Sequence, residues 1–121
     1  MMHFSRLAAV AAAALTVACG GGDSNTSPAP SPEPAEFATV HATPSIRFSP
    51  DSITLTVGGT VDFDFQAVPH NLYFDNAPAG APANITAPTT NATVSRTFST
   101  AGRYAYNCHL HPGMSGVIVV R

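Results

Sequence analysis

Short stretches in which polar and apolar residues alternate fill most of the chain after its first third. Residues 52–57 and 60–65 both alternate in this way, and Gly58 and Gly59 lie between them. Alternation with a period of two is typical of a strand with one buried face, and a Gly-Gly pair can turn the chain. The pattern therefore predicts a β-hairpin over residues 52–65.

Further strands are predicted along the rest of the chain, separated by Pro, Gly and Asn turns. They cover residues 70–75, 92–98, 102–108 and 116–120. The proline-rich residues 76–91 predict a loop over one end of the fold. Several short strands at this spacing, without a helical pattern, predict an all-β protein with an antiparallel Greek-key β-sandwich over residues 39–121.

The first 18 residues form a different pattern, with a short start that carries Arg6 and an apolar run over residues 7–18. The run is shorter than the apolar stretch of about 20 residues that a helix needs to cross a bilayer, so residues 1–18 predict an export signal. The sequence LTVAC resembles the lipobox of bacterial lipoproteins, in which the Cys becomes the acylated first residue, although Thr16 stands where Leu is usual. The resemblance implies a lipid on Cys19.

Residues 19–38 are rich in Gly, Ser and Pro and contain few residues that could form a core. Such a segment buries too little apolar surface to order itself, so it predicts a tether. We expect the N-terminal lipid and the tether to hold the domain at the periplasmic face of a bacterial membrane. We expect this membrane to be the outer membrane. A soluble secreted or periplasmic protein is the alternative.

Length and charge narrow the possible partners. The 121 residues provide one modest domain, which we expect to be a monomer, and the formal net charge is −2. With only five basic side chains, the chain lacks a basic surface that could bind a phosphate backbone, so nucleic acid is excluded as a partner.

Four residues of types that bind soft metals, one Cys, two His and one Met, occur near the end of the chain in the sequence CHLHPGM. Cys108, His111 and Met114 are spaced so that a tight loop between two strands can bring them together. Thiolate and thioether are soft donors and imidazole is borderline, a set that selects copper. The second imidazole must come from another segment, and His70 at the start of a strand is the candidate. Lipidation of Cys19 would leave Cys108 without a disulfide partner, which agrees with a metal role.

With these residues in place, the chain resembles the cupredoxins, the blue copper proteins of the plastocyanin and azurin type, and its ligand loop is most similar to that of amicyanin. The resemblance rests on FSPDSITLTVGGTVDF, VPHN and FSTAGRYAYNCHLHPGMSGVIVV. It implies one copper ion that alternates between Cu(I) and Cu(II). His70 and His111 would be imidazole ligands, Cys108 the thiolate and Met114 the weak axial ligand. Asn71 would connect the two ligand segments and help to hydrogen-bond the Cys sulfur.

A copper ion with four protein ligands has no open position for a substrate, so we expect an electron carrier and not an enzyme. A copper-binding module that delivers the metal is the alternative, since it would use the same ligands. Its partners as a carrier would be a donor and an acceptor redox protein that dock transiently. His109 alternates to the opposite face from Cys108, so we expect an exposed imidazole that is not a ligand.

The resemblance also implies where electrons pass. In cupredoxins the His of the ligand loop exposes a ring edge within an apolar rim. Here that residue is His111, and we expect the rim to comprise Pro112, Gly113, Leu72 and the loop over residues 77–82.

Overall fold

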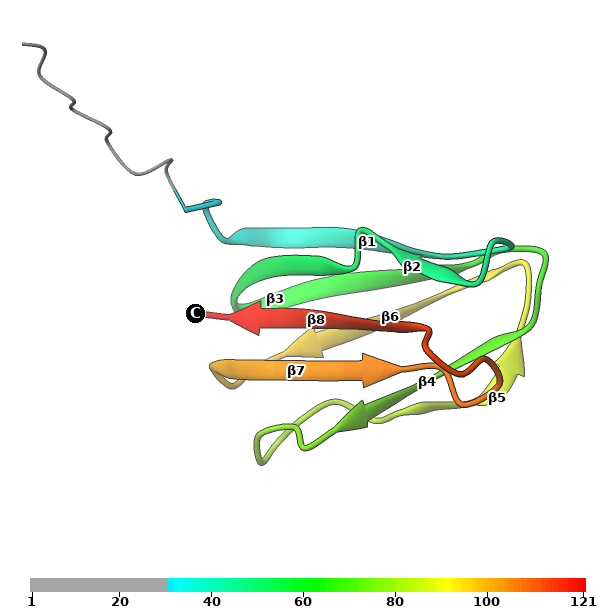
Figure 1. Cartoon of the computed structure of the whole chain (residues 1–121). Coiled ribbons are helices and arrows are strands. Elements are labelled where there is room, and N and C mark those ends of the chain that lie inside the picture. The colour runs from blue at the N-terminus through cyan, green and yellow to red at the C-terminus, as the bar shows by residue number, and fades with distance from the viewer. Residues whose placement is uncertain (1–30) are drawn as a thin grey trace, which may run out of the picture.

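The computed structural model describes residues 31–121, which contain eight β-strands and no helix (Figure 1). The strands are β1 (Ala35–Thr43), β2 (Arg47–Ser49), β3 (Ser52–Phe65), β4 (His70–Asp75), β5 (Ile85–Thr89), β6 (Ala92–Phe98), β7 (Gly102–Asn107) and β8 (Ser115–Val120). The predicted export signal, Cys19 and most of the predicted tether lie outside the described residues. The prediction of an all-β protein is confirmed.

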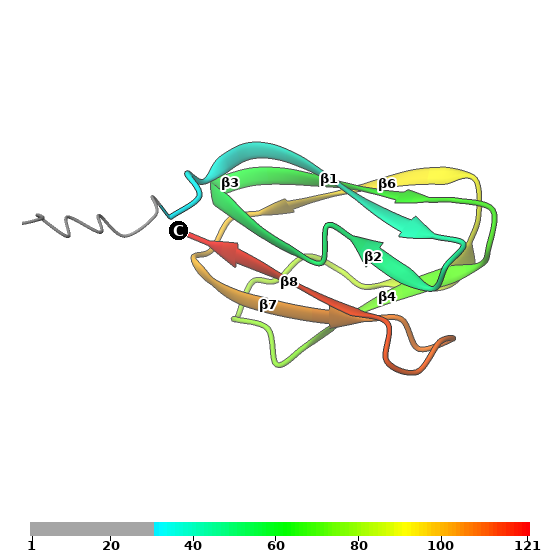
Figure 2. The same ribbon diagram turned by 45° about the horizontal axis from the view of Figure 1, so that its top comes forward.

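The strands form two layers around the core, as the two views show (Figures 1 and 2). Hydrogen bonds connect them in the order β2-β1-β3-β8-β7-β4-β5, and β6 pairs with β3. The β1–β3 and β3–β8 pairs are parallel and the other pairs are antiparallel. The sandwich is therefore mixed, where the local pattern predicted antiparallel pairing throughout.

The predicted hairpin over residues 52–65 is wrong, because these residues form the single long strand β3. Its first part, residues 52–55, pairs with β8, and its second part, residues 59–65, pairs with β6. Gly58 between them has φ of +85°, a conformation that glycine adopts without strain. At Gly59 a Cβ atom would lie 2.6 Å from Leu55 Cγ. The two glycines thus redirect the strand from one layer to the other without reversing it.

Two further boundaries differ from the sequence predictions. Strand β1 begins at Ala35, inside the predicted tether, because residues 37–42 form backbone hydrogen bonds with residues 60–65 of β3. The composition of residues 35–38 alone does not indicate this pairing. The predicted loop over residues 76–91 contains β5, whose Ile85 is buried. Strand β5 is an edge strand of the sheet. Pro88 has no backbone N–H to donate, and on an edge strand this costs no hydrogen bond between central strands.

The core between the layers is rich in aromatic rings that meet edge to face. Tyr106 packs against Phe48 and Phe63 with ring centroids 4.9 and 5.7 Å apart. Phe98 and Tyr104 form another such pair at 5.0 Å. Because these interlocked rings resist displacement, the strands form a rigid scaffold for the loops at their ends.

Four connections meet at one end of the sandwich, on the right in Figure 1: β1–β2, β3–β4, β5–β6 and β7–β8. The beginning of β1 and the C-terminus lie at the other end. The first end therefore combines segments that are far apart in the sequence, and the candidate ligands lie there.

Candidate metal centre

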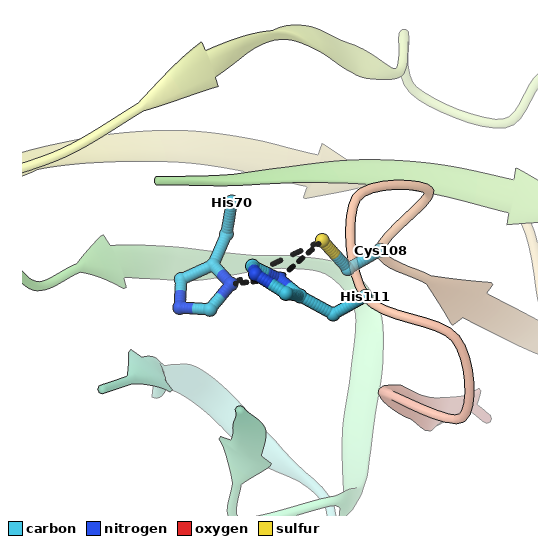
Figure 3. Close-up of side chains that lie close together, drawn as sticks. All are labelled: His70, Cys108 and His111. Atoms are coloured by element: carbon cyan, nitrogen blue, oxygen red, sulfur yellow. Dashed lines mark hydrogen bonds between the residues drawn. The ribbon is translucent and has the colours of Figure 1, made fainter. Parts of the chain in front are cut away.

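Three of the predicted ligands converge in the structure. His70 is the first residue of β4, Cys108 directly follows β7, and His111 lies in the ligand loop, residues 108–114. Each offers a donor atom, and these atoms lie within 4.8 Å of one another (Figure 3). The two Nδ1 atoms are 3.1 Å apart, and Cys108 Sγ lies 3.5 Å from His111 Nδ1 and 3.9 Å from His70 Nδ1. The structure thus brings together residues that are 38 positions apart.

These separations fit a metal ion at the centre of the three atoms. Nitrogen and sulfur ligands that lie about 2.0–2.3 Å from an ion and about 120° apart are themselves about 3.5–3.9 Å apart. The observed distances of 3.1 to 3.9 Å are close to this range. Two imidazoles and one thiolate form the trigonal set of blue copper sites, in which a weak axial Met completes the coordination.

Met114 is positioned to supply that fourth ligand. It directly precedes β8 and is 2% exposed, and its backbone closes the ligand loop. Cys108 N–H donates to Met114 O at 2.9 Å, and Met114 N–H donates to His111 O at 3.2 Å. Gly113 has φ of +85°, which a glycine allows at this tight turn. The loop therefore returns to its starting point with all three of its donor residues on one short segment.

A backbone contact orients the ring of His70. Its Nε2 donates to the carbonyl oxygen of Thr43 at 3.0 Å, so the neutral ring carries its lone pair on Nδ1, which faces Cys108 and His111. Burial lowers the pKa of His70, the bond to Thr43 acts in the opposite direction, and the charge of His111 lowers the pKa further. The neutral form, which can bind a metal, is thus favoured before any ion arrives.

Asn71 connects the two ligand segments through the backbone. Its Oδ1 accepts a hydrogen bond from the N–H of His109 at 2.7 Å, and Asn71 itself is only 5% exposed. This contact links β4 to the residue that follows Cys108. A hydrogen bond from Asn71 to the sulfur, which the resemblance implied, is absent from the hydrogen bonds of the described residues.

His109 lies outside the donor cluster. Its side chain is exposed and stacks on Tyr73 of β4. Among the described residues, His70, Cys108 and His111 form the group that could hold a metal ion, and His109 does not belong to it.

The structure places some of the residues expected around His111 at the surface and others away from it. His111 is partly exposed and its neighbours Pro112 and Gly113 are exposed. Leu72 is 0% exposed because it shares the inward face of β4 with His70, so it cannot contribute to the rim. The loop over residues 77–82 is also excluded.

That loop lies at the other end of the sandwich. Its Pro78 packs against Gly102, the first residue of β7, where a Cβ atom would be 2.5 Å from Pro78 Cγ. Cys108 follows the opposite end of the same strand. The loop was misplaced because the direction of β4 relative to β7 is a tertiary property.

The structure instead places two other apolar residues at the copper end of the molecule. Leu110 is 43% exposed within the ligand loop, and Ile46 is 36% exposed in the β1–β2 turn. Ile46 lines a recess of about 350 Å³ together with Pro112, Gly113 and Met114, and the oppositely charged Arg47 and Asp51 line it as well. The sequence contained a signal for Leu110, since it is an apolar residue in a predicted turn between two His residues. No local sequence pattern indicated that Ile46 lies at this end of the molecule.

Comparison with known proteins agrees with this geometry. The family model of copper binding proteins, the plastocyanin/azurin family, matches residues 35–121. A plastocyanin from Scenedesmus fuscus is 38% identical over 86 residues, which cover 61% of this chain and 86% of that protein. The structure of a reduced amicyanin variant superposes with a TM-score of 0.59 and 29% identity over 69% of this chain and 80% of that one.

A larger enzyme shares the same fold in one part of its chain. The copper-containing nitrite reductase from Thermus scotoductus SA-01 matches with a TM-score of 0.59 and 26% identity, over 75% of this chain but 23% of the reductase. The similarity therefore concerns a small part of that enzyme. The family match covers the whole described sandwich, and His70, Cys108, His111 and Met114 are arranged as a single type 1 copper site. The chain accordingly belongs to the plastocyanin/azurin family of copper-binding proteins, the cupredoxins.

Proposed function

We propose that this cupredoxin is a membrane-tethered periplasmic carrier of single electrons. The observation that supports this most directly is the cluster of His70, Cys108 and His111, whose donor atoms lie within 4.8 Å. Copper bound there supplies one-electron chemistry, since it alternates between Cu(I) and Cu(II). The chain's own residues hold similar positions for both oxidation states, because a rigid sandwich fixes the strand ends from which they project.

Burial of the ligands favours a carrier over an enzyme. His70, Cys108 and Met114 are between 0 and 3% exposed, so a substrate has no access to the centre from their side. His111 alone among the four is partly exposed. The proposed route for the electron is therefore the ring edge of His111.

The surface around this ring suits a transient, largely apolar contact. Pro112 and Gly113 are exposed beside His111, and Leu110 and Ile46 add apolar surface at the same end. Small interfaces of this kind are typical of weak electron-transfer encounters. Reduction by a partner should then depend little on ionic strength, since charge contributes little to docking.

The location is inferred from the beginning of the chain. The apolar run over residues 7–18 followed by Cys19 supports export and lipidation, and residues 19–34 would span from the lipid to β1. No helix within residues 31–121 is long and apolar enough to cross a bilayer. Arg121 at the C-terminus binds Ser31 Oγ at 2.9 Å and Pro32 O at 3.0 Å, at the end of the sandwich away from His111. A tether attached there would turn the electron port away from the membrane.

A spectrum and a matched pair of histidine variants test the copper assignment. Cu(II) added to the purified protein should produce an intense thiolate-to-copper absorption band, and Cys108→Ser should abolish it. His111→Gln should also remove the band, whereas His41→Gln, a histidine on β1 that pairs with Asp64, should retain it. A Cys108→Ser protein with an unchanged spectrum would contradict the assignment.

Two further measurements test the remaining parts of the proposal. Electron exchange with a redox protein should be faster than transfer of copper to a chelator; the reverse order would favour the copper-delivery alternative. Cys19→Ser should move the protein from the membrane fraction to the soluble periplasmic fraction. A protein that stays soluble in both forms would contradict the tether and leave the electron-carrier function intact.

A further inference from the structure

We propose that His109 and Tyr73 form a positioning pair that fastens the Cys108 end of the ligand loop to strand β4 and thereby slows the release of copper. Neither residue is a copper ligand. The inference rests on the copper site and is independent of the direction in which electrons flow.

The two rings are stacked face to face. Their centroids are 3.7 Å apart and their planes differ by 5°. His109 is exposed and Tyr73 is partly buried. A side chain that could extend freely into solvent is therefore held against a strand of the sandwich.

His109 is held from β4 at a second point as well. Its backbone N–H donates to Asn71 Oδ1 at 2.7 Å. Asn71 and Tyr73 are two positions apart on β4, so their side chains leave the strand on the same face. One of them contacts the backbone of His109 and the other contacts its ring.

The position of this attachment gives it a role in the metal site. The antiparallel ladder between β4 and β7 has its last pair at Tyr73 and Asn107, just before Cys108. The stack with His109 continues the attachment to β4 past the thiolate, so Cys108 is held on both sides along the chain. Release of copper requires the sulfur to move away from His70 and His111, and this movement would separate the two rings.

The contribution of the stack sets the expected size of the effect. Loss of the pair should increase the release rate about 2- to 12-fold, which corresponds to ~0.5–1.5 kcal/mol for a well-oriented aromatic pair at about 1.4 kcal/mol per tenfold change. This is smaller than the effect of removing a ligand and large enough to measure.

The test follows transfer of Cu(I) from the loaded full chain to an excess of chelator. Tyr73→Leu and His109→Ser should each release copper about 2- to 12-fold faster than the wild type, and the double variant should be no faster than either. Tyr73→Phe keeps the ring and should release copper at the wild-type rate. Phe37→Leu, which changes a 57% exposed aromatic residue on β1, is the matched control and should also match the wild type.

A second measurement uses the copper-free protein. The ring current of Tyr73 should shift the His109 ring protons upfield in the NMR spectrum, and Tyr73→Leu but not Tyr73→Phe should remove the shift. If Tyr73→Leu fails to fold, the His109→Ser protein carries the release test, because its side chain is exposed and its loss leaves no cavity.

Several results would overturn the inference. Release rates of the single variants equal to the wild type would do so, as would a double variant whose effect is the product of the two single effects. If copper binds with the thiolate absorption band and release is unchanged, this inference alone is wrong. If none of the proteins shows that band, the copper site on which both proposals rest is wrong.

Discussion

The hydroxyl group of Tyr106 should reduce the stability of the protein, and its removal provides a quantitative test of the core. Tyr106 is 1% exposed, and its oxygen has no hydrogen-bond partner among the described residues. The ring lies across Gly116 of β8, where a Cβ atom would be 2.4 Å from both Cζ and the hydroxyl oxygen. Burial raises the pKa of Tyr106 above its usual value, and the charge of Asp51 adds to this shift.

Tyr106→Phe should therefore increase the free energy of unfolding. A buried polar group without a partner costs about 1–3 kcal/mol, while the small void left by one oxygen atom costs a few tenths at ~24 cal/mol per Å³. The ring keeps its edge-to-face contacts with Phe48 and Phe63. We expect a net gain of about 1–2 kcal/mol, or roughly 4–8 °C in Tm for each kcal/mol in a domain of this size. Urea denaturation of the copper-free proteins at neutral pH measures it.

The pH dependence provides an independent measurement of the same group. Above about pH 10 the phenol of the unfolded chain loses its proton, whereas the raised pKa keeps Tyr106 protonated in the folded protein. The unfolded state then binds fewer protons, so the wild-type free energy of unfolding falls as pH rises, by at most about 1.4 kcal/mol per pH unit from this group. Tyr106→Phe lacks this loss, and the difference between the two proteins should widen above about pH 10.

One combination of results would refute this reasoning. A variant that is less stable than the wild type by about 1 kcal/mol or more would mean that the hydroxyl group makes a stabilising hydrogen bond, and a difference that also stays constant from about pH 8 to about pH 11 would mean that the pKa of Tyr106 is not raised.

Three other predictions concern single contacts of the structure. Gly116→Ala should destabilise the protein by about 1–3 kcal/mol in thermal unfolding, because its Cβ would lie 2.4 Å from Tyr106, and unchanged stability would contradict the close approach. Asn71→Ala leaves the N–H of His109 without its acceptor, so stability should fall by about 1–3 kcal/mol and exchange of that amide hydrogen should become faster; an exchange rate equal to the wild type would argue against the contact. In the copper-free protein, burial lowers the pKa of His70, so the unfolded state takes up more protons and the free energy of unfolding falls as pH drops below about 6.5. His70→Gln should flatten this slope in urea denaturation between about pH 5 and 7, and parallel slopes would show that other groups cause it.

Most of the metal site could be predicted from the sequence because it depends on local spacing. Cys108, His111 and Met114 lie within one short loop, whose closure requires only a turn such as the one at Gly113. Strands β4 and β6 begin and end at the predicted residues, since alternation of buried and exposed positions is a property of a few consecutive residues. To predict His70 as a ligand required one assumption about residues distant in the sequence, namely that β4 lies beside β7.

The tertiary structure decided the features that depend on which segments become neighbours. Gly58 and Gly59 are compatible with a hairpin turn and with a bend inside one strand, and the pairing of β3 with both β8 and β6 selects the bend. The stacking of His109 on Tyr73 likewise depends on the register between β4 and β7. Alternation specifies which face of a strand is buried, but the free energy that selects a partner strand comes from packing and hydrogen bonds between distant residues, which no local pattern contains.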